Sequence, residues 1–510
     1  MENIITRINK FSFLAKESSC KYLIVMVCNV KEITKTPENY QANPVDSEYY
    51  SLQQYIEISE TIKEMGFSLK VYFDENDFIE EFSTGKLKNN NPKKIIVLNS
   101  AQKGISEGRK SLIPAFCDLN NIIHTNSNAY VSSFSRNKYH WYSVLRNTKS
   151  NVCPSWLFDP HKGWLFDEKP AENMKVICKL NSESSSIGLK EENIFTYSKS
   201  KEKFIKKMSL EYNSRIIVQK FISGKEVELP VILDSYSGIA MEPVGIKLGN
   251  EKNLKNKILS YDIRGNNKFS FYKFSEDNPT LAKQIQKNAE KVAYDLGIFG
   301  FGRIDYRIDD NNNYFITDIS TNPHLTMSMS IYYNYKNLGY SYDFVLATLL
   351  GLSISRNQDI SSYEEHILTS GKTVFLKRAI VSPEEWISLR KKIGWEIHSK
   401  SVHQTAINHT LYGIILYDAS KKPIGMGRVV GDSKLCFYLQ DIGVVPRWQK
   451  QGVGTKIVTE LLEYISNVAD PKAIVGLMAT DEVTETYYAN FGFKTRKELR
   501  KGAGMIKELS

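Results

Sequence analysis

The sequence predicts a multidomain protein of mixed α/β and α+β class. Its 510 residues are too many for one ordinary hydrophobic core, so two or three domains are expected. The first part of the chain alternates short apolar strands with helical stretches, which is typical of an open parallel sheet. Longer strands follow, and after a polar stretch the chain ends in a smaller α/β unit.

The predicted division of the chain has five parts. They are a polar lead-in (residues 1–20), an N-terminal α/β domain (21–130), a mixed domain (131–352), a linker (353–371) and a C-terminal unit (372–510). The linker is predicted because its residues are mostly polar. No internal repeat and no low-complexity tract interrupts this order.

The composition is that of a soluble, globular, cytoplasmic protein, with 42% hydrophobic and 24% charged residues. The apolar run Tyr22–Cys28 is far shorter than the roughly 20 residues of a membrane span. It also lacks a small-residue cleavage site, so a buried strand is expected rather than a signal peptide. The six cysteines are scattered without a C-x-x-C pair, which argues against disulfides and zinc and favours a reducing compartment.

The formal net charge is +10, and the lysines are spread along the whole chain. A nucleic-acid-binding protein would show a basic face with a recognisable module, and none is found. The charge favours instead a lysine-rich surface that attracts anionic ligands such as nucleotides. Neither a nucleic acid nor a membrane is expected as a partner.

Regular elements can be assigned along the chain. In the N-terminal domain, residues 22–30, 69–73 and 94–99 predict strands, and residues 51–67 have helical spacing. In the mixed domain, residues 174–180, 215–222, 226–233 and 314–319 predict strands, and residues 279–297 predict a helix. Asp309–Asn313 predicts only a hairpin turn.

The C-terminal unit contains a glycine loop, RWQKQGVGTKIV (Arg447–Val458). A predicted strand precedes the loop and an amphipathic helix follows it, so the N–H groups of the loop lie at a helix N-terminus that favours phosphate. Gly452 and Gly454 allow the backbone to approach a ligand closely. The spacing Q-x-x-G-x-G is weak evidence alone. Its context, two paired strands at Lys422–Pro446 and the segment ETYYANFGF (Glu485–Phe493), is more specific.

This combination resembles the GNAT family of acetyl-CoA-dependent N-acetyltransferases, over residues 372–510. The resemblance implies that the loop holds the pyrophosphate of coenzyme A through Gln449, Lys450, Gln451, Gly452, Val453, Gly454 and Thr455. It further implies that a backbone N–H near Val444 and Val445 holds the acetyl carbonyl. Tyr488 matches the tyrosine that protonates the departing thiolate. The alternative for Tyr488 is a packed core aromatic, a role that suits Tyr487 better.

Two roles in the C-terminal unit stay open. The general base is not visible in the sequence: Asp441, Asp481 and Glu482 are candidates, but the pattern favours an ordinary surface or strand carboxylate for each. The candidates for the 3′-phosphate of coenzyme A are Lys494, Arg496, Lys497 and Arg500, which an exposed basic helix explains equally well.

A second candidate phosphate loop, NSESSSIG (Asn181–Gly188), follows a strand that ends in a lysine. A strand pair at Ile216–Ile232 and a hairpin at Gly300–Thr326 come later in the chain. Carboxylates at Asp305 and Asp318 on the paired strands of the hairpin predict a magnesium site, because Mg²⁺ takes carboxylate and phosphate oxygens.

The three stretches in this order resemble the ATP-grasp fold, and within it the D-alanine–D-alanine ligase branch, over about residues 22–351. The resemblance implies ATP and Mg²⁺ as cofactors. The phosphates would contact Lys138 and Lys179, under a loop formed by Ser184, Ser185 and Ser186. Adenine would lie along Gln219, Lys220, Phe221 and Ile222, and the ribose would be held by Glu226. Arg303 would stabilise the acyl-phosphate, and Asp305, Asp318 and Ser320 would face the metal.

Several positions depart from the family pattern. Asp318 stands where the family has Glu, Ser320 where it has Asn, and Gln219 where it has Glu. His324 replaces a small residue beside the second substrate, which argues against D-alanine. Glu48 is a loose match to the substrate-binding glutamate near the family's N-terminus.

The sequence therefore predicts a bifunctional enzyme that joins a carboxylate to an amine with ATP and transfers an acetyl group from acetyl-CoA. The product would be an N-acetylated amide or dipeptide-like small molecule. The altered Asp318 and Ser320 favour the alternative, an acetyltransferase whose ATP-grasp half only binds a nucleotide and regulates. Related ligases are often dimers, so the resemblance allows a homodimer.

Overall fold

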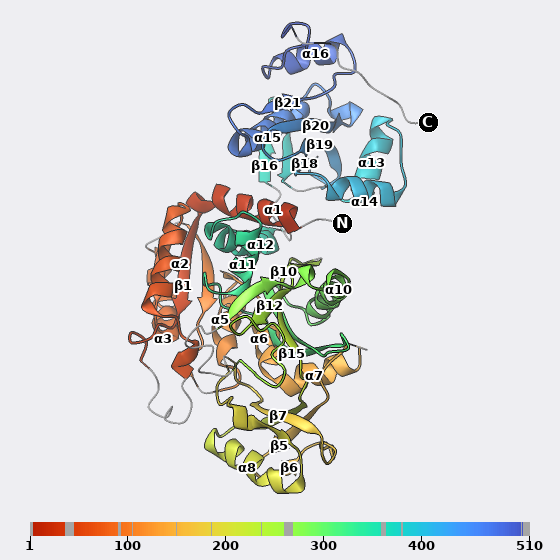
Figure 1. Ribbon diagram of the computed structural model, residues 1–510. Coiled ribbons are helices and arrows are strands. Elements are labelled where there is room, and N and C mark those ends of the chain that lie inside the picture. The colour runs from red at the N-terminus through yellow and green to blue at the C-terminus, as the bar shows by residue number, and fades with distance from the viewer. Residues whose placement is uncertain are drawn as a thin grey trace. The chain divides into compact units, whose positions relative to one another are not determined.

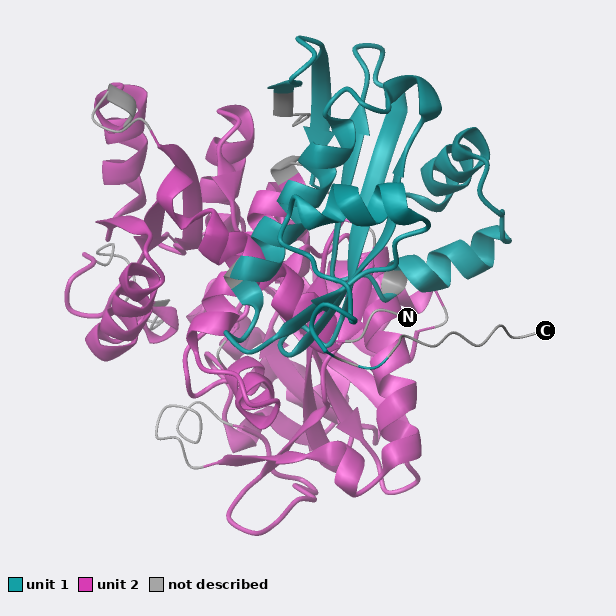
Figure 2. Ribbon diagram, turned by 90° about the horizontal axis from the view of Figure 1, so that it is seen from above, with its two compact units in different colours: residues 1–2, 360–510 teal, residues 3–359 magenta. Residues whose placement is uncertain are grey.

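The structure is a computed structural model. It describes residues 4–35, 45–89, 93–104, 106–148, 150–184, 186–235, 237–259, 269–358, 364–378, 381–500 and 502. The chain forms two compact units, residues 3–359 and residues 360–510 (Figure 2). Each unit has its own hydrophobic core.

A four-stranded parallel sheet opens the first unit, in the order β2-β1-β3-β4. Its strand β1 is labelled in Figure 1. Its strands are β1 (Tyr22–Cys28), β2 (Ser68–Tyr72), β3 (Lys94–Ser100) and β4 (Ile123–His124). Helices α2 (Leu52–Glu64), α3 (Glu75–Ser83), α4 (Lys86–Asn89) and α5 (Leu112–Leu119) belong to this part. Alternate residues of β1 enter two different cores, so every position of β1 is buried, as its continuous apolar run predicts.

The polar lead-in expected for residues 1–20 is wrong for its described part. Residues Ile4–Glu17 form helix α1, which buries Ile8 and Phe11 in the core beside α12 (Asp343–Gln358). The apolar residues of α1 recur at helical spacing, but charged and polar residues stand between them. The segment is therefore polar on average, and its composition did not reveal the helix. The linker expected at residues 353–371 is also shorter, because α12 runs to Gln358 and β16 (Glu364–Ile367) already pairs in the second unit.

Two antiparallel sheets complete the first unit. One has the order β6-β5-β9-β7-β8, with β5 (Ser155–Asp159), β6 (Gly163–Trp164), β7 (Lys175–Leu180), β8 (Ile194–Thr196) and β9 (Ile216–Lys220). The other has the order β13-β12-β10-β14-β15, and β11 (Gly238–Ala240) pairs with β10. Its strands are β10 (Lys225–Leu233), β12 (Val244–Lys247), β13 (Ser270–Lys273), β14 (Gly300–Ile308) and β15 (Tyr314–Ser320).

Helices cover these two sheets. They are α6 (Ala129–Arg136), α7 (Lys138–Arg146), α8 (Glu202–Glu211), α10 (Pro279–Asp295) and α11 (Ser330–Asn337). The long helix α10 begins at Asn278, whose side chain caps the backbone N–H of Leu281. The predicted turn at Asp309–Asn313 is confirmed between β14 and β15.

The second unit holds one sheet in the order β16-β17-β18-β19-β20-β21. Its further strands are β17 (Thr373–Lys377), β18 (Tyr412–Tyr417), β19 (Pro423–Gly431), β20 (Cys436–Val444) and β21 (Ile474–Gly476). The helices are α13 (Pro383–Ile393), α14 (Lys400–Asn408), α15 (Val453–Val468) and α16 (Glu482–Ala489). Helix α15 buries Val453, Ile457, Leu461 and Ile465, one residue per turn, in the core of this unit.

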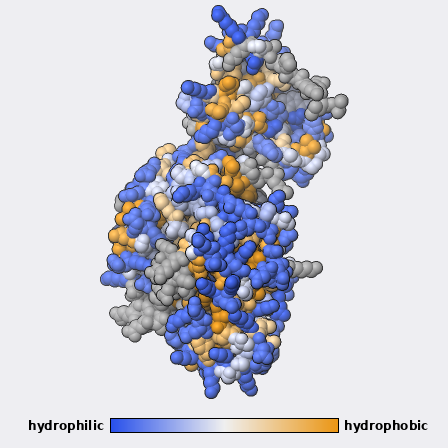
Figure 3. Space-filling view, in the orientation of Figure 1, coloured by the Kyte–Doolittle hydropathy of each residue, from blue (hydrophilic) through white to orange (hydrophobic). Residues whose placement is uncertain are grey.

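Hydrophilic side chains cover most of the face seen in Figure 3, and hydrophobic ones lie in small groups among them. Within the described ranges, no helix is long and apolar enough to cross a membrane. Many of the hydrophobic residues thus lie in the cores of the two units.

The crossing of α1 and α12 depends on Gly351. A Cβ at this position would lie 1.9 Å from the carbonyl oxygen of Phe11, a backbone atom that cannot turn away. We expect Gly351→Ala to lower the free energy of unfolding of the first unit by about 3 kcal/mol, as overpacking does. Urea denaturation followed by hydrogen exchange at the amides of α1 and α12 measures this.

Gly108→Ala is the matched control. Its Cβ would meet nothing closer than 3.5 Å, at the hydroxyl of Ser133, and its φ of −86° suits alanine. Equal protection of α1 in the Gly351→Ala and Gly108→Ala proteins would show that the two helices do not depend on this close approach.

Candidate functional site

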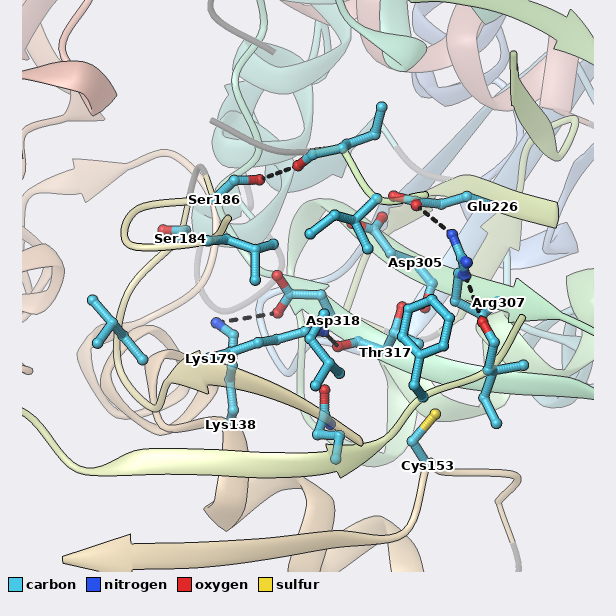
Figure 4. A pocket seen from close by; sticks show the side chains of 18 of the residues that line it. Lys138, Cys153, Lys179, Ser184, Ser186, Glu226, Asp305, Arg307, Thr317 and Asp318 are labelled. Atoms are coloured by element: carbon cyan, nitrogen blue, oxygen red, sulfur yellow. Dashed lines mark hydrogen bonds and ion pairs between the residues drawn. The ribbon is translucent and has the colours of Figure 1, made fainter. Parts of the chain in front are cut away.

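A cleft of about 840 Å³ opens between the two antiparallel sheets of the first unit (Figure 4). Most of the predicted nucleotide and metal residues line it: Lys138, Lys179, Ser184, Ser186, Gln219, Lys220, Phe221, Ile222, Glu226, Asp305 and Asp318. Ser185 lies outside the described residues. Residues from segments as far apart as α7 and β15 are therefore brought into one cavity, which local sequence patterns alone do not guarantee.

One end of the cleft is apolar and offers a single unused acceptor. Ile177, Phe221 and Ile258 form a small buried cluster there. The Nε2 of Gln219 donates to Ser155 Oγ at 3.0 Å, and its Oε1 is buried without a partner in the described part of the chain. An apolar slot beside one acceptor suits a flat heteroaromatic ring with an amino group.

The backbone N–H groups of Lys220 and Phe221 are not available at this end. They donate to the carbonyls of Pro154, at 2.8 Å, and Lys175, at 2.9 Å. Any contact of these two residues with a bound base would therefore use their carbonyl oxygens or side chains.

Glu226 lies beside an arginine that the sequence analysis missed. Glu226 pairs in register with Arg307, and their side chains form an ion pair of 3.1 Å. Arg307 also donates to the carbonyl of Ile222 at 3.0 Å and lies over the ring of Phe221. The signal for Arg307 was its place two residues after Asp305, which puts both on the same face of β14.

The phosphate end of the cleft is rich in cations. Lys138 donates to the carbonyl of Glu183 at 2.6 Å and lies 3.5 Å from a carboxylate oxygen of Asp318. Lys179 points at the carbonyl of Thr317, 3.5 Å away (Figure 4). Burial lowers the pKa of Lys179; Asp318 opposes this shift and Lys138 adds to it. An anion between the two lysines would relieve their repulsion.

The floor of the site is an acidic hairpin. Asp305 pairs with Asp318 and Arg303 pairs with Ser320, so these four side chains lie on one face of β14 and β15. The guanidinium of Arg303 donates to both oxygens of Asp305, at 2.7 and 2.8 Å, and lies 3.4 Å from Glu228. Burial raises the pKa of Asp305 to about 7; Arg303 opposes the shift, and Glu228 and Asp318 add to it.

The donor set of the hairpin fits magnesium with a nucleotide. Among the described residues no three His, Cys, Asp or Glu side chains gather as a metal site. Two carboxylates without a third protein ligand match Mg²⁺, which completes its shell with phosphate oxygens and water. Burial alone would raise the pKa of Asp318, but Lys138, Lys179 and Arg303 outweigh it and hold that pKa below its usual value.

Glu48 and His324 lie on the remaining side of the site. The ring of His324 meets that of Tyr50 edge to face, with 5.4 Å between centroids. Burial lowers the pKa of His324 to about 4, and Lys110 adds to this shift while Glu48 opposes it. Glu48 is buried and accepts hydrogen bonds from Ser184 and Arg109. Glu48 and His324 are far apart in the sequence, and both were predicted to lie near a substrate. The structure places them within electrostatic reach of each other.

The glycine loop of the second unit joins β20 to α15. Gly452 caps α15 with a φ of 96°, a conformation that favours glycine, and a Cβ there would lie 2.8 Å from Thr369 Oγ1. The side chains of Gln449 and Gln451 donate to the carbonyls of Val444, at 3.1 Å, and Arg447, at 2.7 Å. The loop is therefore tied to the end of β20, and the free N–H groups of the first turn of α15 point out of the helix end.

Strand β20 continues past its neighbour. Its pairing with β21 covers only Cys436, Phe437 and Tyr438, whereas β20 runs to Val444 beside β19. Within the described residues, β20 is therefore paired with β19 but not with β21 between Leu439 and Val444, next to the glycine loop.

Family models match both parts of the chain. One described as "D-ala D-ala ligase C-terminus" covers residues 161–351, and one described as "Acetyltransferase (GNAT) domain" covers residues 382–506. The D-alanine–D-alanine ligase of Thermotoga petrophila is 23% identical over 301 residues, which cover 59% of this chain and 91% of that protein. Residues 161–351 therefore match the D-alanine–D-alanine ligase family, and residues 382–506 match the GNAT acetyltransferase family.

Other relatives agree with this assignment. The D-alanine–D-alanine ligase of Haemophilus ducreyi is 28% identical over 188 residues, which are 36% of this chain and only 55% of that protein. The crystal structure of the ligase from Bacillus anthracis complexed with ATP superposes with a TM-score of 0.50 at 16% identity, covering 66% of this chain and 99% of that chain. The latter shows a shared fold.

One of the two residues predicted to hold the acetyl carbonyl has no available backbone N–H. The backbone N–H of Val445 donates to the carbonyl of Ile424 at 2.9 Å, so it is not available to the acetyl group. Val444, which pairs with Gly425, is the remaining residue of the two predicted. The sequence could not reveal this, because a strand end and a splayed strand carry the same residue types.

Tyr487 and Tyr488 are in contact on α16, and Tyr487 reaches the glycine loop. Tyr488 packs edge to face on Tyr487 and on Phe493, and burial raises its pKa, so the phenol keeps its proton. The hydroxyl of Tyr487 lies over Gly454, where a Cβ would come within 3.0 Å of it. Tyr487 therefore packs against the glycine loop.

The candidate bases of the GNAT domain are mostly committed elsewhere. Asp441 forms ion pairs with Arg390, at 3.0 Å, and Arg428, at 2.6 Å. Asp481 caps α16 by accepting from the N–H of Thr484. Glu482 is exposed on the first turn of α16. The basic candidates, Lys494, Arg496, Lys497 and Arg500, are exposed as well.

His324 gives a pH-dependent contribution to the stability of the ligase domain. Its folded pKa of about 4 lies below the ordinary 6.5, so this stability is full above pH 6.5 and is lost as the pH falls toward 4. In the wild type, this loss lowers the free energy of unfolding by up to roughly 3 kcal/mol, and replacing His324 by glutamine should remove that decrease. Urea unfolding across this pH range measures the difference between the two proteins.

His161→Gln, at an exposed histidine of the same unit, serves as the control and should leave the wild-type pH profile in place. Parallel profiles for wild type and His324→Gln would show that His324 is not the group that titrates.

Proposed function

We propose that the chain is a bifunctional enzyme that ligates a carboxylate to an amine with ATP and transfers an acetyl group from acetyl-CoA to an amine. The observation that carries the ligase half is the convergence of Gln219, Lys138 and Lys179 with the acidic hairpin in one cleft. The product is an N-acetylated amide or dipeptide-like small molecule.

The proposed ligase reaction activates a carboxylate. Its oxygen attacks the γ-phosphorus of ATP, ADP leaves, and the resulting acyl-phosphate is attacked by the amine with loss of phosphate. Lys138 and Lys179 hold the phosphates in line, and positioning of this kind supplies most of the catalysis of phosphoryl transfer. Asp305 and Asp318, with Ser320 beside them, would hold Mg²⁺, which neutralises phosphate charge when bound.

Arg303 is proposed to stabilise the charge that develops during transfer. Its guanidinium is fixed by Asp305 and lies close to Glu228, which in turn accepts from Ser330 Oγ at 2.6 Å. A cation held in place before the reaction stabilises the transition state without the cost of reorganisation. The loop at Glu183–Ser186 would cover the phosphates from the other side.

In the proposed acetyl transfer, the glycine loop and the start of α15 hold the pyrophosphate of coenzyme A. The amine attacks the thioester carbonyl, and Tyr488 gives its proton to the leaving thiolate. If acetylation comes first, it removes the competing amine of an amino acid and leaves its carboxylate to be activated. If it comes second, it caps the ligated product.

A second candidate is an acetyltransferase whose ATP-grasp half binds a nucleotide and regulates. The ion pair of Asp318 with Lys138 favours it, since this shorter carboxylate is already engaged by a lysine. The two candidates differ in one observable, which is ATP turnover.

The experiment incubates the purified protein with ATP, Mg²⁺ and pooled amino acids and small amines, with and without acetyl-CoA. ADP, AMP and phosphate are quantified, and products are identified by mass. ADP formation that needs both an acid and an amine supports the ligase. A ligated product that gains one acetyl group when acetyl-CoA is present supports the action of both domains on one molecule. Acetyl-CoA consumption with no ADP in any pool supports the regulatory alternative instead.

Arg303→Lys should lower the rate of ADP formation about 100- to 1,000-fold, because lysine cannot reproduce the two-pronged contact with Asp305. The affinity for ATP should stay within about threefold, since Arg303 acts on the transferred group. Steady-state kinetics at varied ATP separates the two effects. Arg146→Lys, at an exposed ion pair with Glu168, is the control. A normal rate in Arg303→Lys would remove Arg303 from the mechanism.

Tyr488→Phe should slow acetyl transfer by at least about 100-fold, because the thiolate would leave without a proton. Tyr487→Phe tests the neighbouring phenol in the same assay. A strong loss in Tyr487→Phe with little change in Tyr488→Phe would exchange the roles of the two residues. ADP formation in both variants serves as the internal control.

A further inference from the structure

Five charged side chains gather beside the phosphate loop and are called the basic cluster here. They are Glu48, Arg109, Lys110, Arg136 and Glu183. They come from the four segments η2 (Val45–Glu48), η3 (Arg109–Ser111), α6 and the loop after β7. The side chains of Glu48 and Arg109 are each 1% exposed, so the cluster is a buried part of the site.

Both carboxylates of the basic cluster are occupied by guanidinium groups. Arg109 donates to the two oxygens of Glu183 at 2.9 and 2.8 Å and to Glu48 at 3.0 Å. Arg136 donates to Glu183 at 3.1 Å. Ser184 also donates to Glu48. Neither carboxylate is therefore left unpaired to bind a cationic group of a substrate.

Lys110 is held much more loosely than the arginines. Its Nζ lies 3.3 Å from Glu48 and 3.4 Å from the hydroxyl of Ser184, and no shorter contact is found in the described residues. Three cations face two carboxylates, so the cluster carries one excess positive charge. Burial lowers the pKa of Lys110 to about 8; Glu48 opposes this shift, and Arg136 and Arg109 add to it. A buried charge without a full partner is costly, and an anion would remove that cost.

The arginines of the cluster also have unused donors. The Nε groups of Arg109 and Arg136 are buried and make no hydrogen bond within the described residues. Guanidinium and ammonium donors around one excess charge suit a carboxylate, which accepts from several donors at once.

The basic cluster adjoins the reacting end of the ligase cleft. Ser184, which lines the cleft, contacts Glu48, Lys110 and Arg136. His324 lies within electrostatic reach of Lys110, Glu48 and Arg303. An acid bound with one carboxylate toward Arg303 and the γ-phosphate could therefore extend to Lys110.

We infer that the carboxylate substrate of the ligase is a dicarboxylic acid, whose second carboxylate binds Lys110 and the neighbouring arginines of the basic cluster. The inference rests on the proposed ligase function and names its substrate class. One carboxylate oxygen forms the new bond to the γ-phosphorus, the bond from that phosphorus to the bridging oxygen breaks, and ADP leaves with the electron pair. The second carboxylate only fixes the acid in place.

The test compares diacids with monoacids of the same chain length. Isothermal titration calorimetry measures the binding of succinate, glutarate and N-acetylglutamate to the full-length protein, with and without Mg²⁺ and a non-hydrolysable ATP analogue. Butyrate, pentanoate and N-acetylnorvaline are the monoacid partners. The best diacid should bind at least about tenfold more tightly than its monoacid, as expected for a charge-assisted contact in a buried site.

Variants assign the preference to the basic cluster. Lys110→Gln should remove the diacid preference and leave the affinity for the ATP analogue within about twofold. Lys110→Arg keeps the charge and should retain the preference, which separates loss of charge from loss of fold. Lys94→Gln, at an exposed lysine of β3, is the matched control and should behave as wild type.

The outcomes separate this inference from the proposed function. Equal binding of diacids and monoacids, or a preference that survives Lys110→Gln, overturns the inference. ADP formation with monoacids alone also overturns it, although the ligase function would stand. Failure to bind the ATP analogue would sink the ligase function instead, and titration of the diacids without nucleotide would still report on the cluster.

Discussion

The ligase site depends on one arginine among buried carboxylates. The antiparallel register sets Glu228, Asp305 and Asp318 across three neighbouring strands, where like charges repel in a medium that screens them poorly. Arg303 bridges Asp305 and Glu228 and lies within electrostatic reach of Asp318. Removing one partner of a buried ion pair usually costs several kcal/mol. Arg303 therefore supports both the pairing of β10, β14 and β15 and the clustering of carboxylates at the proposed metal site.

The side of the cleft that holds Lys138 and Glu183 has the reverse electrostatic character. Arg109 and Arg136, from the part of the chain before β5, hold Glu183 of the phosphate loop, and Lys138 holds its carbonyl. A basic wall thus faces an acidic floor. A magnesium nucleotide carries charges of both signs and complements both surfaces.

Much of this arrangement could be predicted from local sequence. The carboxylates Asp305 and Asp318 on two paired strands predicted a metal site, and Lys179 near the end of β7 marked the phosphate end. Arg303 was identified only through the family resemblance. The rest depends on contacts between distant segments. Arg109 and Glu183 are 74 residues apart, and nothing local tells which carboxylate a given arginine will meet. Helix α1 was missed for the same reason, since its apolar stripe becomes visible only against α12. The hydrogen bond that engages Val445 likewise depends on the neighbouring strand β19.

Lys110 differs from the other buried charges in a way that bears on function. The carboxylates Glu48 and Glu183 already have Arg109, and Asp441 in the GNAT domain has two arginines of its own. The fold therefore has no need of a further cation next to Glu48, and a half-satisfied ammonium lowers stability. Charged groups placed against stability inside a cleft are typical of binding and catalytic sites. Because its contacts with Glu48 and Ser184 are long, Lys110 can exchange them for a contact with the carboxylate of a ligand.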